Sequence, residues 1–97
     1  MLKIYVDIDG TICETKDKDY ANAVPIPENI AKINKLHDEG HYIFYWTARG
    51  SSSGIDWADI TERQLRDWGC RYSMLSNHKK PSFDILIDDR AKRIEEI

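Results

Sequence analysis

The sequence has few cysteines, no long apolar run and no excess of basic charge. Cys13 and Cys70 stand far apart and lack the paired spacing of a zinc site, so we expect two ordinary thiols in a reducing compartment. The longest apolar runs, such as Tyr42 to Trp46, reach about five residues, whereas a membrane span needs about 20. Asp7 and Asp9 come too early for the hydrophobic region of a signal peptide. We therefore expect a cytoplasmic protein without a membrane partner.

The charge balance argues against a polyanionic partner. The formal net charge is −3 and the pI is near 5.5, so no overall basic field attracts a nucleic acid, and extended nucleic-acid binding is disfavoured. Hydrophobic residues make up 41% of the chain, which is too apolar for a disordered protein and sufficient for a packed core. The 97 residues are predicted to form a single domain, residues 1–97.

Short apolar stretches alternate with helical patterns along the chain. Strands are predicted at Leu2 to Ile8, His41 to Thr47, Tyr72 to Leu75 and Phe83 to Ile87, and helices at about 28–39, 57–68 and 91–97. A polar stretch from Cys13 to Pro25 is predicted to be a loop or flap. Strands that alternate with helices indicate right-handed βαβ units. The predicted fold class is therefore α/β, a small three-layer domain with a Rossmann-like parallel sheet and no cap domain.

Polar side chains follow three of the predicted strands. Asp7 and Asp9 end the first, Thr47 ends the second, and Asp88 and Asp89 end the last. Ligands of a parallel sheet bind outside the carboxyl ends of its strands, so these residues are expected to converge. Carboxylates that lie together repel one another unless a cation neutralises them, and Mg²⁺ prefers carboxylate, water and phosphate oxygens. The pattern predicts a Mg²⁺ site at this edge.

Four motifs, in this order, resemble those of the haloacid dehalogenase superfamily of phosphohydrolases. The first is Asp7-Ile8-Asp9-Gly10-Thr11, which matches the family pattern Asp-x-Asp-Gly-Thr at every position. The second is Thr47 at the end of a hydrophobic strand. The third is Lys80-Pro81, which fits the pattern better than Lys79 does, and the fourth is the acidic pair Asp88-Asp89. The motifs span nearly the whole chain.

The resemblance implies a Mg²⁺-dependent phosphomonoester hydrolase with four catalytic residues. Asp7 would attack phosphorus and form an aspartyl-phosphate. Asp9, two residues further along the strand and on the same side, would act as general acid and then as general base. Thr47 would donate a hydrogen bond to a phosphate oxygen, and Lys80 would hold the negative charges of nucleophile and phosphate together.

The resemblance also implies ligand sets. The implied metal ligands are Asp7, Asp9, Asp88 and Asp89, with Asp89 preferred to Asp88 as the direct ligand. The implied substrate-binding residues are Gly10, Thr11, Thr47, Ala48, Arg49 and Lys80. For Arg49, contact with substrate and an exposed surface position remain equal alternatives. The implied substrate is a small phosphorylated molecule such as a sugar phosphate or a nucleotide.

Several alternatives stay open at this point. Thr61, Gln64 and Trp68-Gly69 resemble small cap-free phosphatases associated with carbohydrate biosynthesis. The site could instead transfer phosphate to another hydroxyl, act on the ends of nucleotides or nucleic acids, or bind phosphate in a regulatory module without turnover. Trp46 is predicted to face away from the phosphate site because it alternates with Thr47. The short sheet leaves an edge that a second chain could protect, so a homo-oligomer stays open as one alternative, and selectivity could come equally from the flap or from a neighbouring subunit.

Overall fold

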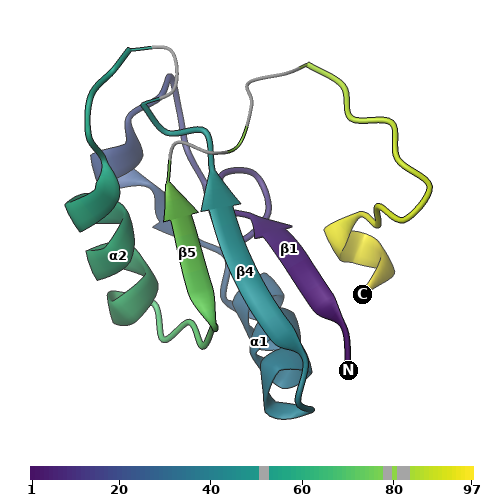
Figure 1. Cartoon of the computed structure of the whole chain (residues 1–97). Coiled ribbons are helices and arrows are strands. Elements are labelled where there is room, and N and C mark those ends of the chain that lie inside the picture. Colours follow the sequence, from purple (N-terminus) through teal and green to yellow (C-terminus); the bar gives the residue numbers. More distant parts are fainter. Residues whose placement is uncertain (51–52, 78–79, 81–83) are drawn as a thin grey trace.

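The chain has an α/β fold with a parallel sheet, as the sequence predicts. The computed structural model describes residues 1–50, 53–77, 80 and 84–97. Within them, β1 (Lys3–Asp7), β4 (Tyr42–Thr47) and β5 (Met74–Asn77) form a three-stranded sheet in the order β1-β4-β5 (Figure 1). Both strand pairs are parallel, and Asp7 pairs with Trp46. The carboxyl ends of the three strands therefore lie at one edge, where the predicted site falls.

The two helices begin and end close to the predicted residues. Helix α1 (Pro27–Asp38) has Pro27 at its first position, where the missing N–H would be unpaired in any case. Helix α2 (Ala58–Asp67) follows β4. Gly40, just after α1, has a φ of 99°, which side chains rarely adopt and which ends the helix cleanly. No helix in the described ranges is long and apolar enough to cross a membrane.

A small flap separates β1 from α1. It contains the short antiparallel strands β2 (Cys13–Glu14) and β3 (Val24–Pro25), with the 3₁₀ turn η1 (Tyr20–Asn22) between them. The flap corresponds to the loop predicted at Cys13 to Pro25. It is held to the domain because the N–H of Ile26 donates to the carbonyl of Ile12 at 2.8 Å.

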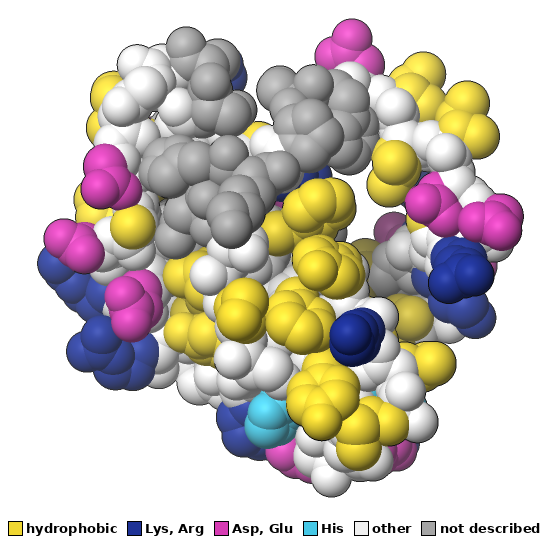
Figure 2. Space-filling model, in the orientation of Figure 1, with side chains coloured by type: hydrophobic (Ala, Val, Ile, Leu, Met, Phe, Trp, Pro, Cys, Tyr) yellow, Lys and Arg dark blue, Asp and Glu magenta, His cyan; other side chains and the backbone are white. Residues whose placement is uncertain are grey.

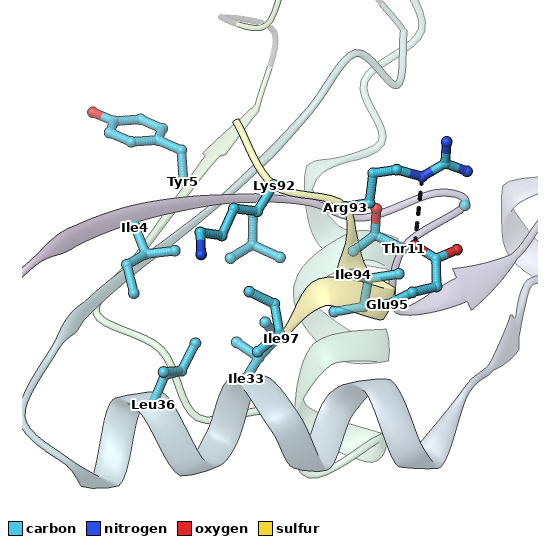
Figure 3. Close-up of a pocket in the computed structure, with 12 residues that line it drawn as sticks. Ile4, Tyr5, Thr11, Ile33, Leu36, Lys92, Arg93, Ile94, Glu95 and Ile97 are labelled. Carbon is cyan, nitrogen blue, oxygen red and sulfur yellow. Dashed lines mark ion pairs between the residues drawn. The ribbon is translucent and has the colours of Figure 1, made fainter. Parts of the chain in front are cut away.

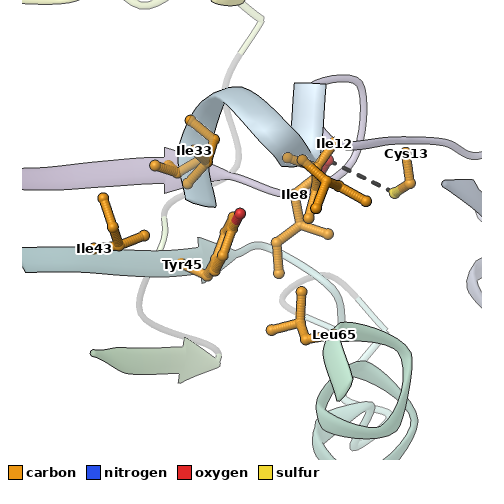
Figure 4. Close-up of a cluster of buried hydrophobic side chains, with 9 residues drawn as sticks. Ile8, Ile12, Cys13, Ile33, Ile43, Tyr45 and Leu65 are labelled. Atoms are coloured by element: carbon orange, nitrogen blue, oxygen red, sulfur yellow. Dashed lines mark hydrogen bonds between the residues drawn. The ribbon is translucent and has the colours of Figure 1, made fainter. Parts of the chain in front are cut away.

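One face of the sheet forms the hydrophobic core. Val6 of β1 and Ile43 and Tyr45 of β4 pack with Ile33 of α1 and Leu65 of α2, and all five are buried (Figure 4). Burying an aliphatic side chain of this size contributes about 1.5–3 kcal/mol. The alternation of these strand positions with outward ones fixes the register, because a slip of one residue would expose the whole set.

The other face of the sheet carries aromatic side chains in the open. Tyr5 stacks on Phe44 with ring centroids 5.1 Å apart and meets the edge of Trp46 at 5.4 Å, and its side chain is still 59% exposed. Figure 2 shows hydrophobic side chains gathered over the middle of this face. The described part of the chain thus forms two layers, and the predicted third layer is not found in it.

The C-terminal part differs most from the prediction. Phe83 lies outside the described residues, and 84–87 form no strand, with Ile85, Leu86 and Ile87 exposed by 78%, 55% and 93%. A strand needs a neighbouring strand to hydrogen-bond with, and residues 84–87 pair with none in the described chain. The helix predicted at 91–97 shrinks to the 3₁₀ turn η2 (Ile94–Glu96), since seven residues are too few to sustain an α-helix alone.

Candidate active site

Asp7 and Lys80 form the centre of the site. Asp7 ends β1 at the carboxyl edge of the sheet, and its Oδ1 accepts hydrogen bonds from the Ile8 N–H at 3.0 Å and from Lys80 Nζ at 2.5 Å. The Asp7 side chain remains 39% exposed, whereas that of Lys80 is 12% exposed. The structure thus places a cation directly beside an accessible carboxylate. Lys79, the alternative to Lys80, lies outside the described residues.

Trp46 lies beside this pair, and the prediction that it faces away from the site is wrong. Lys80 Nζ is 5.8 Å from the centre of the Trp46 ring. Trp46 is the register partner of Asp7, so the two side chains share one face of the sheet. The prediction placed the site on the side of Thr47, and only the register between β1 and β4 could have shown that Asp7 faces the opposite side.

A tight turn after β1 positions Asp9. The N–H groups of Thr11 and Ile12 both donate to the carbonyl of Ile8, at 3.1 and 3.0 Å, and the Gly10 N–H donates to the carbonyl of Cys13 at 2.9 Å. Gly10 has a φ of 86°, a conformation that other residues adopt only with strain. Gly10 and Thr11 therefore shape the turn, and their contact with substrate stays a prediction.

Asp9 is held in place by Arg49 through two hydrogen bonds. Arg49 Nε donates to Oδ2 at 3.0 Å and Nη2 donates to Oδ1 at 2.8 Å. The Thr15 hydroxyl donates to Oδ1 at 2.6 Å. The Arg49 side chain is fully buried and that of Asp9 is 27% exposed. A forked pair of this geometry fixes the plane of the carboxylate as well as its position.

Arg49 in turn joins three parts of the chain. Its Nη1 donates to the Thr61 hydroxyl at 3.1 Å and to Gln64 Oε1 at 2.6 Å, both on α2. Its guanidinium carbon lies 4.9 Å from the centre of the Tyr20 ring. Gln64 Nε2 donates to the Tyr20 carbonyl at 2.6 Å, which ties the flap to the same cluster. The alternative that Arg49 is an exposed surface residue is wrong, and its contact with substrate stays a prediction.

Thr47 contacts this cluster through the backbone of Arg49. It is only 1% exposed, and its hydroxyl oxygen accepts the N–H of Arg49 at 3.0 Å. Ala48, between them, is half-buried. The Thr47 hydroxyl shapes the turn that directs Arg49 toward Asp9. The roles of Thr47 and Ala48 in phosphate binding stay predictions.

Cys13 is a neutral thiol at the edge of the cluster. Burial and the negative charge of Asp9 raise its pKa to about 11. Its Sγ lies 3.5 Å from Asp9 Oδ1. Both Cys13 and Cys70 are free thiols, as the sequence predicts.

The environment of Asp9 determines its ionisation. Burial favours the neutral acid, but the hydrogen bonds from Arg49 and Thr15, with the charge of Arg49, outweigh burial and hold the pKa of Asp9 below its ordinary value of 3.8. A carboxyl group whose pKa is lower in the folded state stabilises the folded protein at pH values above its ordinary pKa. This stabilisation is lost as the pH falls through the folded-state pKa.

The lowered pKa of Asp9 predicts how the free energy of unfolding changes in acid. Between about pH 5 and about pH 2, the free energy of unfolding of the wild type should fall more steeply than that of an Asp9→Asn variant, because the variant has no proton to gain at this position. Urea unfolding at a series of pH values measures both slopes. Equal slopes would show that the Arg49 pair does not control the ionisation of Asp9.

The acidic pair lies on the C-terminal segment. Asp88 and Asp89 are exposed, and Asp88 Oδ1 accepts the N–H of Arg90 at 2.7 Å. In the part of the chain that the structure describes, no three His, Cys, Asp or Glu side chains gather closely enough to hold a metal ion. The carboxylates of the predicted set are the hard oxygen donors that suit Mg²⁺, and Asp7 is accessible. The chemistry of these carboxylates fits the ion, but the described residues of a single chain do not bring the ligands together.

Comparison with known proteins gives structural matches only. No protein-family model and no curated sequence matches the chain. A crystal structure of a target protein from Vibrio cholerae superimposes with a TM-score of 0.85 and 29% identity, over 99% of this chain and 86% of that one. The arrangement described above is therefore close to that of an experimentally determined protein.

A second match concerns an enzyme. The D,D-heptose 1,7-bisphosphate phosphatase from B. bronchiseptica, crystallised with magnesium and phosphate, superimposes with a TM-score of 0.58 and 21% identity over 94% of this chain. The chain spans about half of that phosphatase, 54% of its length. At this identity the likeness concerns the fold alone, which the chain shares with part of that phosphatase.

Proposed function

We propose that the chain is a Mg²⁺-dependent phosphomonoester hydrolase of the haloacid dehalogenase type that works through an aspartyl-phosphate. The observation that carries the proposal is the contact between Lys80 and Asp7 at the carboxyl edge of the sheet. An anionic nucleophile can approach a phosphate dianion only if cations offset the repulsion. Lys80 is positioned to reduce the charge of the nucleophile and to attract a phosphate oxygen.

The proposed reaction gives the two aspartates the roles that the sequence resemblance implies. A carboxylate oxygen of Asp7 attacks phosphorus, the bond from phosphorus to the ester oxygen breaks, and the leaving oxygen takes a proton from Asp9, which must first gain that proton because its pair with Arg49 lowers its pKa. Asp9 then removes a proton from a water molecule, the water oxygen attacks the phosphorus of the aspartyl-phosphate, and inorganic phosphate leaves with Asp7 restored. Arg49 holds the Asp9 carboxylate in the ionised form, which is the form that removes the proton from water.

Mg²⁺, when bound, supplies positive charge to the phosphate oxygens and to the attacking carboxylate. The residues that would hold it are Asp7, the backbone carbonyl of Asp9, and the acidic pair Asp88 and Asp89, with Asp89 as the direct ligand. The phosphatase from B. bronchiseptica was crystallised with magnesium and phosphate, which supports this choice of ion.

The substrate class follows from the open surroundings of Asp7. Between β1 and α1 the described chain carries only the flap, which is too small for an independent cap. Such a site gains little binding energy from remote parts of a small substrate. We propose a small phosphate ester, a sugar phosphate or nucleotide, with selectivity provided by the flap or by a neighbouring subunit.

Metal removal gives the first test of the activity. A panel of sugar phosphates and nucleotides is incubated with the protein, and released phosphate is measured with Mg²⁺, with excess chelator, and after Mg²⁺ is added back. We expect activity to be lost with chelator and restored by Mg²⁺, with Ca²⁺ a poor substitute because its coordination is larger and looser. Full activity in excess chelator would contradict the proposed mechanism.

A further inference from the structure

Residues Asp84–Asp89, here called the arm, leave the body of the domain. Figure 1 shows the arm descending from the carboxyl edge of the sheet towards its amino edge, so that it runs opposite to β1. Its three aliphatic residues, Ile85, Leu86 and Ile87, are all more than half exposed. Three consecutive aliphatic side chains in water are costly, and such an extended stretch offers unpaired backbone groups to another strand.

The edge of β1 is open on the side that faces the arm. In the described sheet β1 pairs only with β4. A hollow of about 300 Å³ runs along this edge, and Figure 2 shows a gap between the sheet and the C-terminal segment. The hollow is lined by apolar side chains from β1, α1 and the C-terminus (Figure 3), among them Ile4, Tyr5, Ile33, Leu36, Ile94 and Ile97, and by the polar side chains of Thr11, Lys92, Arg93 and Glu95. It is a place for one more strand.

The chain's own arm cannot become that strand in the parallel direction. A return from the carboxyl edge to the amino edge of a parallel sheet takes a crossover of a dozen or more residues. Only six residues, 78–83, separate Asn77 at the end of β5 from Asp84. One of them, Lys80, is held at the carboxyl edge by its bond to Asp7. If the arm packed against β1 in its present direction, it would be antiparallel to β1. Asp88 and Asp89 would then lie towards the amino edge of the sheet, away from Asp7.

We propose that two copies of the chain exchange arms around a two-fold axis. A two-fold axis perpendicular to the sheet makes the arm of the second copy antiparallel to the arm of the first, and therefore parallel to β1. It would enter between β1 and the first copy's own arm, in the hollow, and the contact is self-complementary, as a two-fold interface requires. The turn η2 keeps its place in each copy, where Lys32 Nζ donates to the Ile94 carbonyl at 3.3 Å. Short connections such as 78–83 favour exchange over closure within one chain.

The exchange would complete the active site, and this part rests on the proposed function. A parallel strand ends at the same edge as β1, so Asp88 and Asp89 of the second copy would arrive beside Asp7 of the first. This explains why the described residues of a single chain bring no three metal-binding side chains together. Each dimer would then hold two sites, and each site would take residues from both copies.

A disulfide between two different chains tests the exchange without any assay of activity. When Asp88 lies opposite Asp7, Leu86 lies opposite Tyr5, so one chain carries Tyr5→Cys and a co-expressed chain carries Leu86→Cys. We expect oxidation to give a covalent mixed dimer on a non-reducing gel, and light scattering to give a dimer for the wild type. The matched control pairs Leu86→Cys with Tyr42→Cys, which lies one strand beyond β1 and opposite Lys3, at about 12 Å and beyond the reach of a disulfide.

The unsubstituted chain controls for Cys13 and Cys70. A monomer at every concentration, or a mixed dimer that forms equally from Tyr42→Cys, would overturn the exchange of arms. Activity then tests the shared site. Co-expression of an Asp7→Asn chain with an Asp88→Asn/Asp89→Asn chain should restore about a quarter of wild-type activity, because half of the dimers are mixed and each has one complete site.

These outcomes separate the two proposals. An active wild type whose inactive variants show no recovery when combined would overturn the shared site. If the wild type itself releases no phosphate, the proposed function fails, and the cross-link still decides whether arms are exchanged.

Discussion

Replacing Asp7 with asparagine is expected to abolish turnover, with a loss of more than about 10⁴-fold in kcat, because an amide cannot attack phosphorus. Asparagine has nearly the volume of aspartate, and Asp7 is at the exposed end of β1, so the fold should persist. The side-chain oxygen of the amide can still accept the N–H of Ile8. Released phosphate measures the loss, and circular dichroism checks the fold.

A matched control is Asp67→Asn, which makes the same change on the exposed end of α2. It should retain wild-type activity. A wild-type kcat in Asp7→Asn would show that Asp7 is not the nucleophile. An equal loss of kcat in both variants would show that the effect has no connection with the site.

Replacing Arg49 with methionine is expected to have the largest effect on stability. Arg49 is fully buried and pairs with Asp9, so its removal leaves a largely buried carboxylate without its cation. Breaking one partner of such a pair costs about 3–5 kcal/mol in the free energy of unfolding. The residual folded protein should lose on the order of 10²-fold in kcat, since Asp9 is no longer oriented for proton transfer. Urea unfolding and steady-state kinetics measure the two effects.

The double variant Asp9→Asn/Arg49→Met separates charge from packing. It removes both charges, and it should recover a substantial part of the lost stability. Arg71→Met is the control for a surface pair, because Arg71 and Asp38 are half exposed, and it should change stability far less. No recovery in the double variant would mean that Arg49 stabilises the fold through its contacts with Thr61 and Gln64 instead.

The helices and the first two strands of the sheet could be predicted because each carries its own local signal. Pro27 and Gly40 mark the ends of α1, and the periodicity of apolar residues gives α2 its bounds within a residue or so. The strand at 83–87 has an equally apolar sequence, yet residues 84–87 stay unpaired. A strand depends on its neighbour, and the local apolar pattern of 84–87 does not show that the six-residue connection before it is too short for a crossover to the edge of β1.

The sequence predicts which residues belong to the candidate site better than it predicts their contacts. The motif order predicts that Asp7, Asp9 and Lys80 belong together, and the structure brings Lys80 onto Asp7. Arg49 could not be placed, because its burial depends on α2 and the flap, which meet around it in the fold. No local pattern marks Thr15 or Tyr20, whose contacts with Asp9 and Arg49 arise from the shape of the flap.

The central claim is that Asp7 becomes phosphorylated during turnover. Borohydride reduces an aspartyl-phosphate to homoserine, so mass spectrometry of the peptide that contains residue 7 can detect the intermediate directly. The Asp9→Asn variant, which should hydrolyse the intermediate slowly, is mixed with substrate and Mg²⁺ and then quenched with borohydride. We expect homoserine at position 7, and none when substrate is omitted. Phosphate release by the wild type with no homoserine at position 7 in the variant, or with homoserine at position 9 in place of 7 in the wild type, would contradict it.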